Sequence, residues 1–469
     1  MVNAEKTIAY VDQFWDEHIV PPLTEYIKIP NKSPHFDPDW EANGHMEKVL
    51  QMAKSWLEEH PIPGSKLHVG RLPGRTPLLL LEVPGDVDKT VMLYGHLDKQ
   101  PEMTGWREDL GPWKPVMEDG KLYGRGGADD GYAIFASICA LKALAEQGIK
   151  HARCVVLIEF SEESGSPDLP YYVDHYRNEI GDVDLVICLD SGAGNYDQLW
   201  STTSLRGMVG GILRVDVLRE GVHSGDASGI VPSSFRLARQ LISRIEDEHS
   251  GEIILNALKA PIPEARINQA RKVAQTLGDE VYTKFPFLEG MSPANPDPTE
   301  LILNRTWRAA LEIIGQSGIP DTTAGGNVLR PYTEFKLSFR LPPTLPHQEA
   351  QAAIEKALSE NPPYGAKVSV DFSDAATGWN APELAPWLGE ALDAASHTFY
   401  GRPTLHMGEG GSIPFMGMLG DKFPKAQFVV TGVLGPASNA HGPNEFLHVP
   451  YAKKLTACVI DILARHART

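Results

Sequence analysis

The alternation of short apolar strands with amphipathic helices is the feature that most constrains the fold of this chain. Residues 76–83, 90–94, 153–160 and 183–189 form apolar runs typical of buried strands, and residues 130–147 between them show a helical period. This order predicts an α/β domain with a mostly parallel sheet and helices on both faces. Such sheets place their functional sites beyond the carboxyl ends of the strands.

A change in the strand pattern predicts a second domain within the first. From about residue 207 the strands alternate apolar and polar side chains, which is typical of a sheet with one covered face. The earlier pattern returns near residue 380. We therefore expect a catalytic domain in two parts, 1–206 and 380–469, interrupted by a smaller α+β domain at 207–379.

Charge and cysteine content restrict the partners and the compartment. The formal net charge is 43 − 61 = −18, which argues against nucleic acid and anionic membranes as partners. The start of the chain has no signal-peptide pattern, and no apolar run reaches the ~18–20 residues that span a bilayer. The cysteines are widely spaced and are predicted to be buried thiols: Cys139, Cys154, Cys188 and Cys458. These features favour a cytoplasmic protein.

The end of the strand 90–94 carries the first candidate site residues. The strand is followed by Gly95, His96, Leu97 and Asp98. Residues two apart in an extended chain project to the same side. We therefore expect His96 to offer one ring nitrogen to a metal while Asp98 holds the other.

Further histidines and acids follow other predicted strands or begin a helix. Each alone would be an ordinary polar residue, but together they form a candidate set of metal ligands: His96, Asp129, Glu162, Glu163, Asp190 and His441. Imidazole and carboxylate without thiolate suit Zn²⁺, Mn²⁺ or Co²⁺. The set exceeds what one ion needs, and it suits two ions about 3.5–4 Å apart that share a carboxylate.

The acidic pair Glu162–Glu163 suggests a division of roles. We expect this segment to be extended, so the two side chains should point in opposite directions. One could then bind metal while the other acts as general base. Arg340 lies in an apolar strand and requires a carboxylate partner, either internal or from a ligand. His223 lies in a glycine-rich turn, where it could be functional or simply a polar turn residue.

These segments together resemble the M20 metallopeptidases, in particular the carnosinase-like cytosolic dipeptidases. The resemblance runs in family order over residues 90–450. It is carried by these segments: Tyr94-Gly95-His96-Leu97-Asp98, Tyr123-Gly124-Arg125-Gly126 with Asp129-Asp130, Ser161-Glu162-Glu163-Ser164-Gly165-Ser166, Leu189-Asp190, His223-Ser224-Gly225, Ser338-Phe339-Arg340, Gly408-Glu409-Gly410-Gly411-Ser412-Ile413-Pro414 and His441-Gly442-Pro443-Asn444-Glu445.

The resemblance implies two divalent metal ions in each subunit, with zinc the first expectation and manganese or cobalt as alternatives. One ion would be held by His96, Asp129 and Asp190. The other would be held by Asp129, Glu163 and His441, so that Asp129 bridges the two.

The resemblance also implies roles for residues that do not bind metal. Asp98 would orient His96, and Glu162 would be the general base for a metal-bridged water. His223, from the inserted lid and dimerisation domain, would stabilise the oxyanion in the partner subunit of a homodimer. Arg340 and Asn327 would bind the substrate carboxylate.

The resemblance also assigns a role to one further loop, and the sequence departs from the family pattern at one position. The loop of Glu409, Gly410, Gly411 and Ser412 would line the other end of the substrate pocket. Relatives usually carry lysine after the aspartate pair, whereas Gly131-Tyr132 follows Asp130 here.

The resulting hypothesis is a two-metal hydrolase that cleaves dipeptides or short peptides with a free carboxyl terminus. An alternative of the same family is a deacylase or amidohydrolase acting on N-acyl amino acids. An alternative of a different class is a catalytically inactive binding protein, which would lack a ligand or the base; none of these positions is missing.

Overall fold

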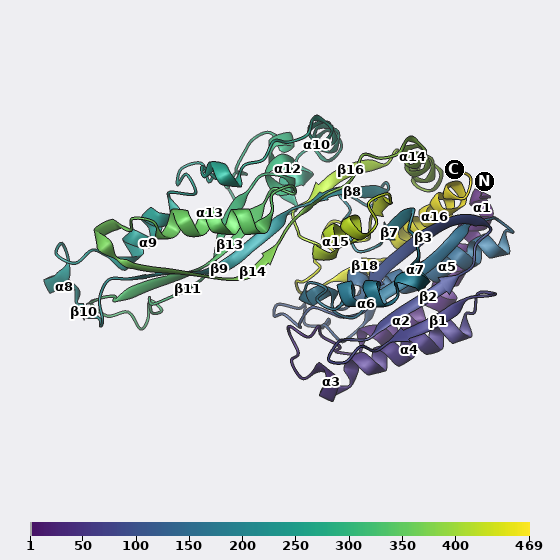
Figure 1. Cartoon of the computed structure of the whole chain (residues 1–469), viewed down its shortest axis with the longest axis horizontal. Coiled ribbons are helices and arrows are strands. Elements are labelled where there is room, and N and C mark those ends of the chain that lie inside the picture. The colour runs from purple at the N-terminus through teal and green to yellow at the C-terminus, as the bar shows by residue number, and fades with distance from the viewer. Residues whose placement is uncertain (1) are drawn as a thin grey trace. The chain divides into compact units, whose positions relative to one another are not determined.

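The chain forms two compact units, and the computed structural model describes residues 2–469 of it (Figure 1). Unit 1 comprises Met1–Thr203, Ala381–His406 and Met418–Thr469, and unit 2 comprises Ser204–Asn380 and Met407–Gly417. We had placed residues 407–417 in the catalytic domain, whereas the structure groups them with unit 2. The role of unit 2 as a lid or dimerisation domain stays a prediction.

Unit 1 is built on a mixed sheet with a parallel centre. Its strands lie in the order β1-β2-β6-β3-β7-β17-β8. Pairing is parallel from β6 to β17, whereas β1, β2 and β8 pair antiparallel with their neighbours. The bounds are β1 (Lys66–Gly70), β2 (Leu78–Val83), β3 (Val87–His96), β6 (Ala152–Glu159), β7 (Leu185–Cys188), β17 (Gln427–Val430) and β8 (Trp200–Leu205). The predicted α/β class is confirmed, with the parallel pairing confined to the centre.

Apolar sequence explains the centre of this sheet and the helices that pack against it. Residues 91–94 of β3 are fully buried, as expected of a strand covered on both faces. Helix α5 packs on β3 and also contacts α1 and α16. The helices of unit 1 are α1 (Ala4–Phe14), α2 (Val20–Ile27), α3 (Trp40–Asn43), α4 (His45–Glu59), α5 (Tyr132–Glu146), α6 (Leu169–His175), α7 (Arg177–Ile180), α14 (Pro386–Tyr400) and α16 (Val449–His466), with a π-helical turn at Trp15–Ile19 and with α15 (Pro414–Lys422) shared with unit 2.

A small second sheet joins distant segments of unit 1. It consists of β4 (Val116–Glu118), β5 (Lys121–Tyr123) and β18 (Phe446–His448), with β5 in the middle. The pairing of β18 with β5 aligns Phe446 with Tyr123. It therefore brings the loop before β18 to the loop after β5.

Two expectations about the chain as a whole can be compared with the structure. All four cysteines are buried and free, as predicted. Among the helices of residues 2–469, none is both long and apolar enough to cross a bilayer.

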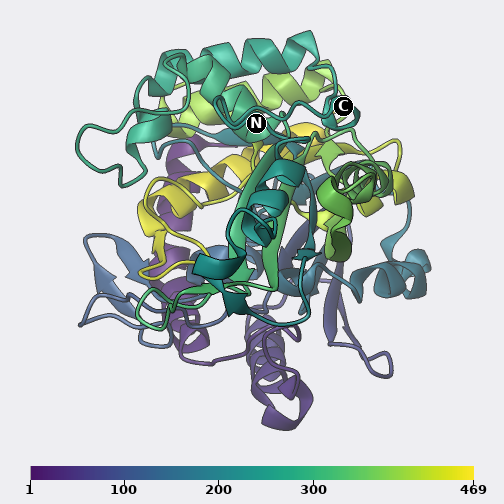
Figure 2. The same ribbon diagram turned by 90° about the vertical axis from the view of Figure 1, so that its left-hand side faces the viewer.

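Unit 2 contains a four-stranded antiparallel sheet in the order β11-β13-β9-β14. Helices α9 and α13 lie together on one face of this sheet (Figures 1 and 2). The strands of this sheet are β9 (Gly207–Asp216), β11 (Ala310–Ser317), β13 (Tyr332–Leu341) and β14 (Lys367–Ala376). The short strands β10 (Val222–His223), β12 (Val328–Leu329) and β15 (Trp379–Asn380) lie outside it, and β16 (Leu405–Glu409) lies where the chain passes between the units. The helices are α8 (Ser224–Ala227), α9 (Ser234–Ile242), α10 (Glu264–Leu277), α11 (Glu280–Thr283), α12 (Pro298–Thr306) and α13 (His347–Ser359).

Alternating burial along the strands explains why the helices cover one face. Along β13, Phe335, Leu337 and Phe339 are at most 4% exposed and pack in one apolar cluster with residues of α9 and α13. The residues between them are polar and less buried, which is the period of two expected of a strand.

Candidate metal centre

The carboxyl ends of three neighbouring parallel strands form the floor of the candidate centre. His96 is the last residue of β3, the Glu162–Glu163 pair follows β6, and Asp190 follows β7. Because β3 lies between β6 and β7 with parallel pairing, these ends meet at one edge of the sheet.

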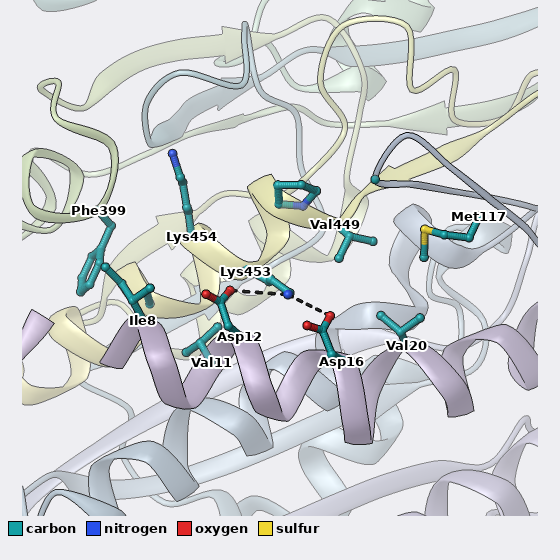
Figure 3. A pocket seen from close by; sticks show the side chains of 13 residues that line it. Ile8, Val11, Asp12, Asp16, Val20, Met117, Phe399, Val449, Lys453 and Lys454 are labelled. Carbon is teal, nitrogen blue, oxygen red and sulfur yellow. Dashed lines mark ion pairs between the residues drawn. The ribbon is translucent and has the colours of Figure 1, made fainter. Parts of the chain in front are cut away.

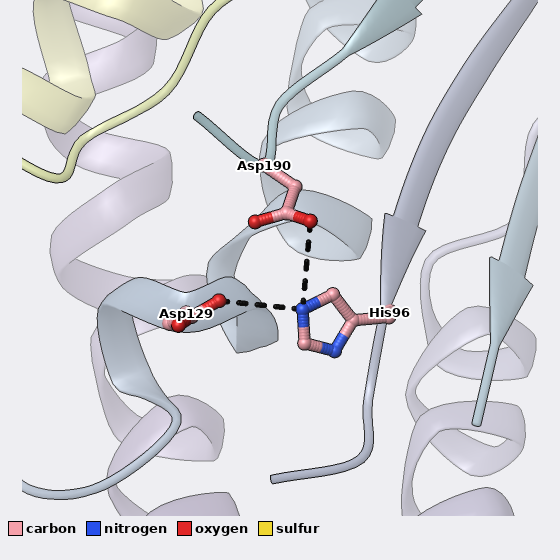
Figure 4. Close-up of side chains that lie close together, drawn as sticks. All are labelled: His96, Asp129 and Asp190. Carbon is pink, nitrogen blue, oxygen red and sulfur yellow. Dashed lines mark ion pairs between the residues drawn. The ribbon is translucent and has the colours of Figure 1, made fainter. Parts of the chain in front are cut away.

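His96, Asp129 and Asp190 form the first group of ligand atoms (Figure 4). The Nε2 atom of His96 lies 3.4 Å from Oδ1 of Asp129 and 3.8 Å from Oδ2 of Asp190. All three residues are buried, and one ligand atom from each lies within 4.8 Å of the others. This spacing leaves room for one cation between them.

Asp129 also belongs to a second group, with Glu163 and His441. The Nε2 atom of His441 lies 3.1 Å from Oδ2 of Asp129 and 3.3 Å from Oε2 of Glu163. The two oxygens of Asp129 thus face different histidines, Oδ1 toward His96 and Oδ2 toward His441. A carboxylate placed in this way can bridge two cations.

Two buried atoms of the five ligand residues lack a hydrogen-bond partner among residues 2–469. They are Nε2 of His96 and Oε1 of Glu163. Buried polar atoms are nearly always satisfied, so these two require a partner that the protein does not supply. A divalent cation in each group would supply it, and imidazole with carboxylate is a ligand set suited to zinc, manganese or cobalt. The residues therefore fit two metal ions.

The electrostatics of the centre show how strongly it favours positive charge. Burial raises the pKa of Asp190 to about 7 and raises the pKa values of Glu162 and Glu163 above their usual range. Burial acts in the same direction on Asp129, but the neighbouring imidazoles of His441 and His96 outweigh it and lower the pKa of that carboxyl group. For most of these acids the anionic form is costly until a positive charge lies beside it.

Asp98 organises two parts of the centre at once. Its Oδ1 lies 3.3 Å from Nδ1 of His96 and accepts the backbone N–H of Glu162 at 3.1 Å, while Oδ2 accepts the N–H of Glu163 at 2.9 Å. The first contact is the one expected from the sequence, and the other two were not anticipated. Glu162–Ser164 forms a 3₁₀ turn, so our expectation of an extended segment was wrong. The carboxylate of Asp98 stabilises the turn because it accepts two N–H groups at its start.

A buried ion pair that we had not singled out connects the loops of Asp129 and His441. Arg125 and Glu445 are 1% and 0% exposed, and Nη1 of Arg125 lies 2.5 Å from Oε2 of Glu445. Arg125 also donates to the carbonyl oxygen of Gly442 at 2.6 Å, and Glu445 accepts the N–H of Gly126 at 3.0 Å. Both residues occur in the motifs of the sequence, and the buried arginine was the available signal.

The structure explains the departure at Gly131. A Cβ atom at this position would lie 2.3 Å from the ring of Tyr26, so a lysine has no room here. Lys99 packs instead against Gly126, where a Cβ atom would lie 2.6 Å from its Cε atom, and it is 0% exposed. Its Nζ atom donates to the carbonyl oxygens of Tyr26 and Ile29, each at 2.8 Å, at the end of α2. A cation at a helix C-terminus satisfies carbonyl groups that the helix leaves open.

Unit 2 carries the remaining predicted residues in two separate places. His223 in β10 pairs with Val328, next to Asn327, and the N–H of Ser224 donates to the carbonyl oxygen of Asn327 at 2.9 Å. His223 is exposed, and its Nδ1 accepts the N–H of Gly225 at 3.1 Å. In neutral imidazole the Nε2 atom then carries the proton and is available as a donor.

Arg340 lies in β13 of the four-stranded sheet, whereas β10 and β12 form a separate two-stranded sheet. The Nη1 atom of Arg340 is 3.4 Å from Oγ of Ser412. In the same loop as Ser412, the carbonyl oxygen of Gly410 accepts a hydrogen bond from Arg206. Arg340 pairs with Met208 near the carboxyl end of β13, whereas β12 comes just before the start of β13. At the usual rise of a strand, the start of β13 lies ~27 Å from Arg340. The structure brings His223 to Asn327 and Arg340 to Ser412, and it does not bring Asn327 to Arg340 within one chain.

A surface pocket of about 500 Å³ elsewhere in unit 1 contains none of these residues (Figure 3). It lies between the N-terminal helical segment and α16, where Lys453 pairs with Asp12 at 3.5 Å and with Asp16 at 2.9 Å. The convergence of histidines and acids at the edge of the main sheet marks that edge as the candidate site, although the pocket is well formed.

Comparison with known proteins identifies the family. Residues 92–465 match the family model of peptidase family M20/M25/M40. The chain belongs to this family. The resemblance inferred from the motifs is thereby confirmed, together with the hydrolase class.

Relatives within the family are similar over most of their length. The chain is 29% identical over 454 residues to the cysteinylglycine-S-conjugate dipeptidase of Corynebacterium striatum, covering 93% of this chain and 94% of the relative. It is 28% identical to the human Beta-Ala-His dipeptidase over 374 residues, covering 76% and 71%. Among solved structures, the dipeptidase Dug1p of Saccharomyces cerevisiae matches with a TM-score of 0.77 at 21% identity, covering 100% of this chain and 99% of that one. Human carnosine dipeptidase 1 matches with a TM-score of 0.76 at 23% identity, covering both chains fully. These structures support the fold.

Metal uptake should release protons and weaken as the pH falls. Metal ions bind the deprotonated ligands, whereas Asp190 with a pKa raised to about 7 and His96 with a raised pKa retain protons in the metal-free protein near neutrality. We expect lower affinity for Zn²⁺ or Mn²⁺ at about pH 6 than at about pH 8. Calorimetric titration in two buffers of different ionisation enthalpy measures the protons released. An affinity independent of pH, with no proton release, would contradict this account of the centre.

Asp98→Asn should weaken metal binding about 10–100-fold, the usual cost of losing a group that orients a ligand. An amide has only one acceptor oxygen, so it cannot accept both N–H groups of the Glu162–Glu163 turn and also hold His96. The matched control is Asp184→Asn, because Asp184 accepts the N–H of Thr90 near the other end of β3. Competition with a coloured chelator measures both affinities. Equal affinities for the two variants would show that Asp98 does not act on the ligands.

Proposed function

We propose that this protein is a two-metal dipeptidase that hydrolyses short peptides with a free carboxyl terminus. The observation that carries the proposal is the pair of ligand groups sharing Asp129, with Glu162 beside them. The relatives named as dipeptidases, including those of Corynebacterium striatum and human, support the substrate class. We place the protein in the cytoplasm, consistent with its free, buried cysteines.

Five residues would hold the metals, zinc first and manganese or cobalt as alternatives. They are His96, Asp129, Asp190, Glu163 and His441. When bound, the two ions would polarise the peptide carbonyl and lower the pKa of the attacking water. The protein would set the positions of the ligands. Asp98 orients His96, and the Arg125–Glu445 pair connects the loops that carry Asp129 and His441.

Glu162 is the general base of this proposal. Burial raises its pKa, with the negative charge of Asp190 adding to the effect, and a carboxylate of raised pKa is a stronger proton acceptor. It would take the proton from the attacking water and transfer it to the leaving nitrogen. Glu163, whose Oε2 faces His441, would act as a ligand instead.

The residues of unit 2 would bind the substrate in a homodimer. Arg340 would bind the substrate carboxylate as a bidentate partner. His223 would donate from Nε2 to the developing oxyanion, and Asn327 would act beside it. The sheet separates His223 and Asn327 from Arg340 by most of the length of β13. They could act on the same dipeptide if a second subunit supplies one of the two sets.

The alternatives have less support. A deacylase of N-acyl amino acids would need the same metal centre, but the similar proteins described above are named as dipeptidases. An inactive binding protein would not need both ligand groups and Glu162, all of which the chain retains.

Glu162→Gln should reduce turnover of a dipeptide by ~10²–10⁴-fold, the usual contribution of general acid–base catalysis. The metal content should stay near two per chain, because Glu162 is in neither ligand group. Glu163→Gln is the matched comparison and should lose metal as well as activity. Kinetics with metal analysis on both variants measures this. Loss of metal from Glu162→Gln alone would mean that the two roles are exchanged.

Mixing inactive His223→Ala with inactive Glu162→Gln should restore activity if the site is shared between subunits. A mixed dimer has one site in which an intact Glu162 meets an intact His223. Random exchange of equal amounts should therefore return about a quarter of the parental activity, because half of the dimers are mixed and each has one competent site. Mass spectrometry of a tagged subunit verifies the exchange. Exchange without recovery would show that His223 acts within its own chain or not at all.

A further inference from the structure

Three arginine side chains of unit 2 converge on the loop of residues 410–412. Arg206 precedes β9, Arg305 lies in α12 and Arg340 lies in β13. Arg206 donates from Nε to the carbonyl oxygen of Gly410 at 3.2 Å, and Arg340 donates from Nη1 to Ser412 at 3.4 Å. A Cβ atom at Gly410 would lie 3.2 Å from Nη2 of Arg206 and 3.2 Å from Cγ of Arg305. Elements distant in the sequence thus gather three positive charges around one loop.

Among residues 2–469, no carboxylate forms an ion pair with these three arginines. Among the described residues, no acidic group lies within ion-pair distance of any of the three arginines, and this includes Glu409 in the adjoining strand. Two other buried or half-buried arginines of the chain do have such partners, since Arg125 pairs with Glu445 and Arg153 pairs with Glu82. Buried arginine normally pairs with a carboxylate, so the unpaired cluster indicates that a ligand supplies the negative charge.

The three side chains differ in how many donors remain available. Arg206 is 8% exposed and is fixed by carbonyl oxygens, since its Nη1 donates to Asn304 and Arg308, each at 3.2 Å. Among residues 2–469, the guanidinium of Arg305 donates one hydrogen bond, from Nη2 to the sulfur of Met407, and its buried Nε has no partner. Among the described residues, the guanidinium of Arg340 makes one hydrogen bond, the long one to Ser412. Arg206 therefore has a structural role, whereas Arg305 and Arg340 each keep guanidinium N–H donors that no protein group accepts among residues 2–469.

We propose that Arg305 and Arg340, beside the fixed charge of Arg206, form a binding site for two carboxylates of one amino acid residue. The protein would then prefer peptides whose carboxy-terminal residue is acidic. This inference rests on the proposed dipeptidase function, in which Arg340 binds the main-chain carboxylate. It adds Arg305 as the partner of the side-chain carboxylate.

Charge arithmetic favours two carboxylates over one. A single carboxylate is satisfied by one bidentate arginine. A second guanidinium held nearby without its own partner would repel the first and would remain partly desolvated. In the cluster, the charges of Arg340 and Arg305 add to burial in lowering the pKa of Arg206 to about 10. Two carboxylates on an aspartate or glutamate residue would relieve this repulsion, and one of them is already required by the proposed reaction.

Alanylglutamate and alanylglutamine provide the test, because they differ in charge and scarcely in shape. We expect the metal-loaded protein to hydrolyse alanylglutamate with kcat/KM ~10–100-fold higher, the usual worth of a hydrogen-bonded charge pair. Arg305→Met should abolish this preference, and Arg305→Lys should retain part of it. The matched control is Arg308→Met, three residues away, because Arg308 already pairs with Glu300 at 2.7 Å. Thermal unfolding verifies that each variant is folded.

A second measurement does not depend on hydrolysis. Free glutamate should bind to the metal-loaded protein more tightly than free glutamine in calorimetry, and Arg305→Met should remove the difference. Equal kcat/KM for the two dipeptides, or a preference that survives Arg305→Met, would overturn the inference. Failure to hydrolyse any dipeptide, with selective binding of glutamate intact, would contradict the proposed function and leave the dicarboxylate site supported. Equal binding of the two amino acids would overturn the site itself.

Discussion

The carboxylate of Asp129, placed between two histidines, is the interaction on which the rest of the catalytic unit depends. One oxygen faces His96 and the other faces His441, and these histidines come from segments that are distant in the sequence. Around them lie further buried carboxylates whose pKa values rise because burial and mutual repulsion oppose their charge. Such a cluster is costly unless cations occupy it. The cluster therefore destabilises the metal-free protein and favours the binding of cations.

The segments that carry the ligands are held in place by strand pairing and by buried polar contacts of residues that do not bind metal. The parallel strands β3, β6 and β7 place their ends side by side, which fixes His96, Asp190 and the acidic turn. Asp98 connects this turn to His96, and the buried Arg125–Glu445 pair connects the two loops that meet through β5 and β18. Orientation by such supporting contacts is what gives a metal site its affinity and selectivity.

The sequence predicted the parts of this structure that follow from period and strand ends. The apolar runs gave the central strands, and the polar residues after them gave the ligand candidates, because parallel strands end at one edge. Contacts between residues that are distant in the sequence could not be predicted in this way. Nothing in the local pattern showed that Glu162–Glu163 forms a turn held by Asp98, or that the side chain of Lys99 packs against Gly126. The separation of Asn327 from Arg340 likewise depends on the length and direction of β13.

Two metal ions bridged by Asp129 are the central claim, and anomalous diffraction from crystals loaded with Zn²⁺ tests it most directly. The account predicts two peaks about 3.5–4 Å apart in each chain, each beside one oxygen of Asp129. One peak should also contact His96 and Asp190, and the other Glu163 and His441. A single peak at saturating metal, or two peaks without Asp129 between them, would contradict the account.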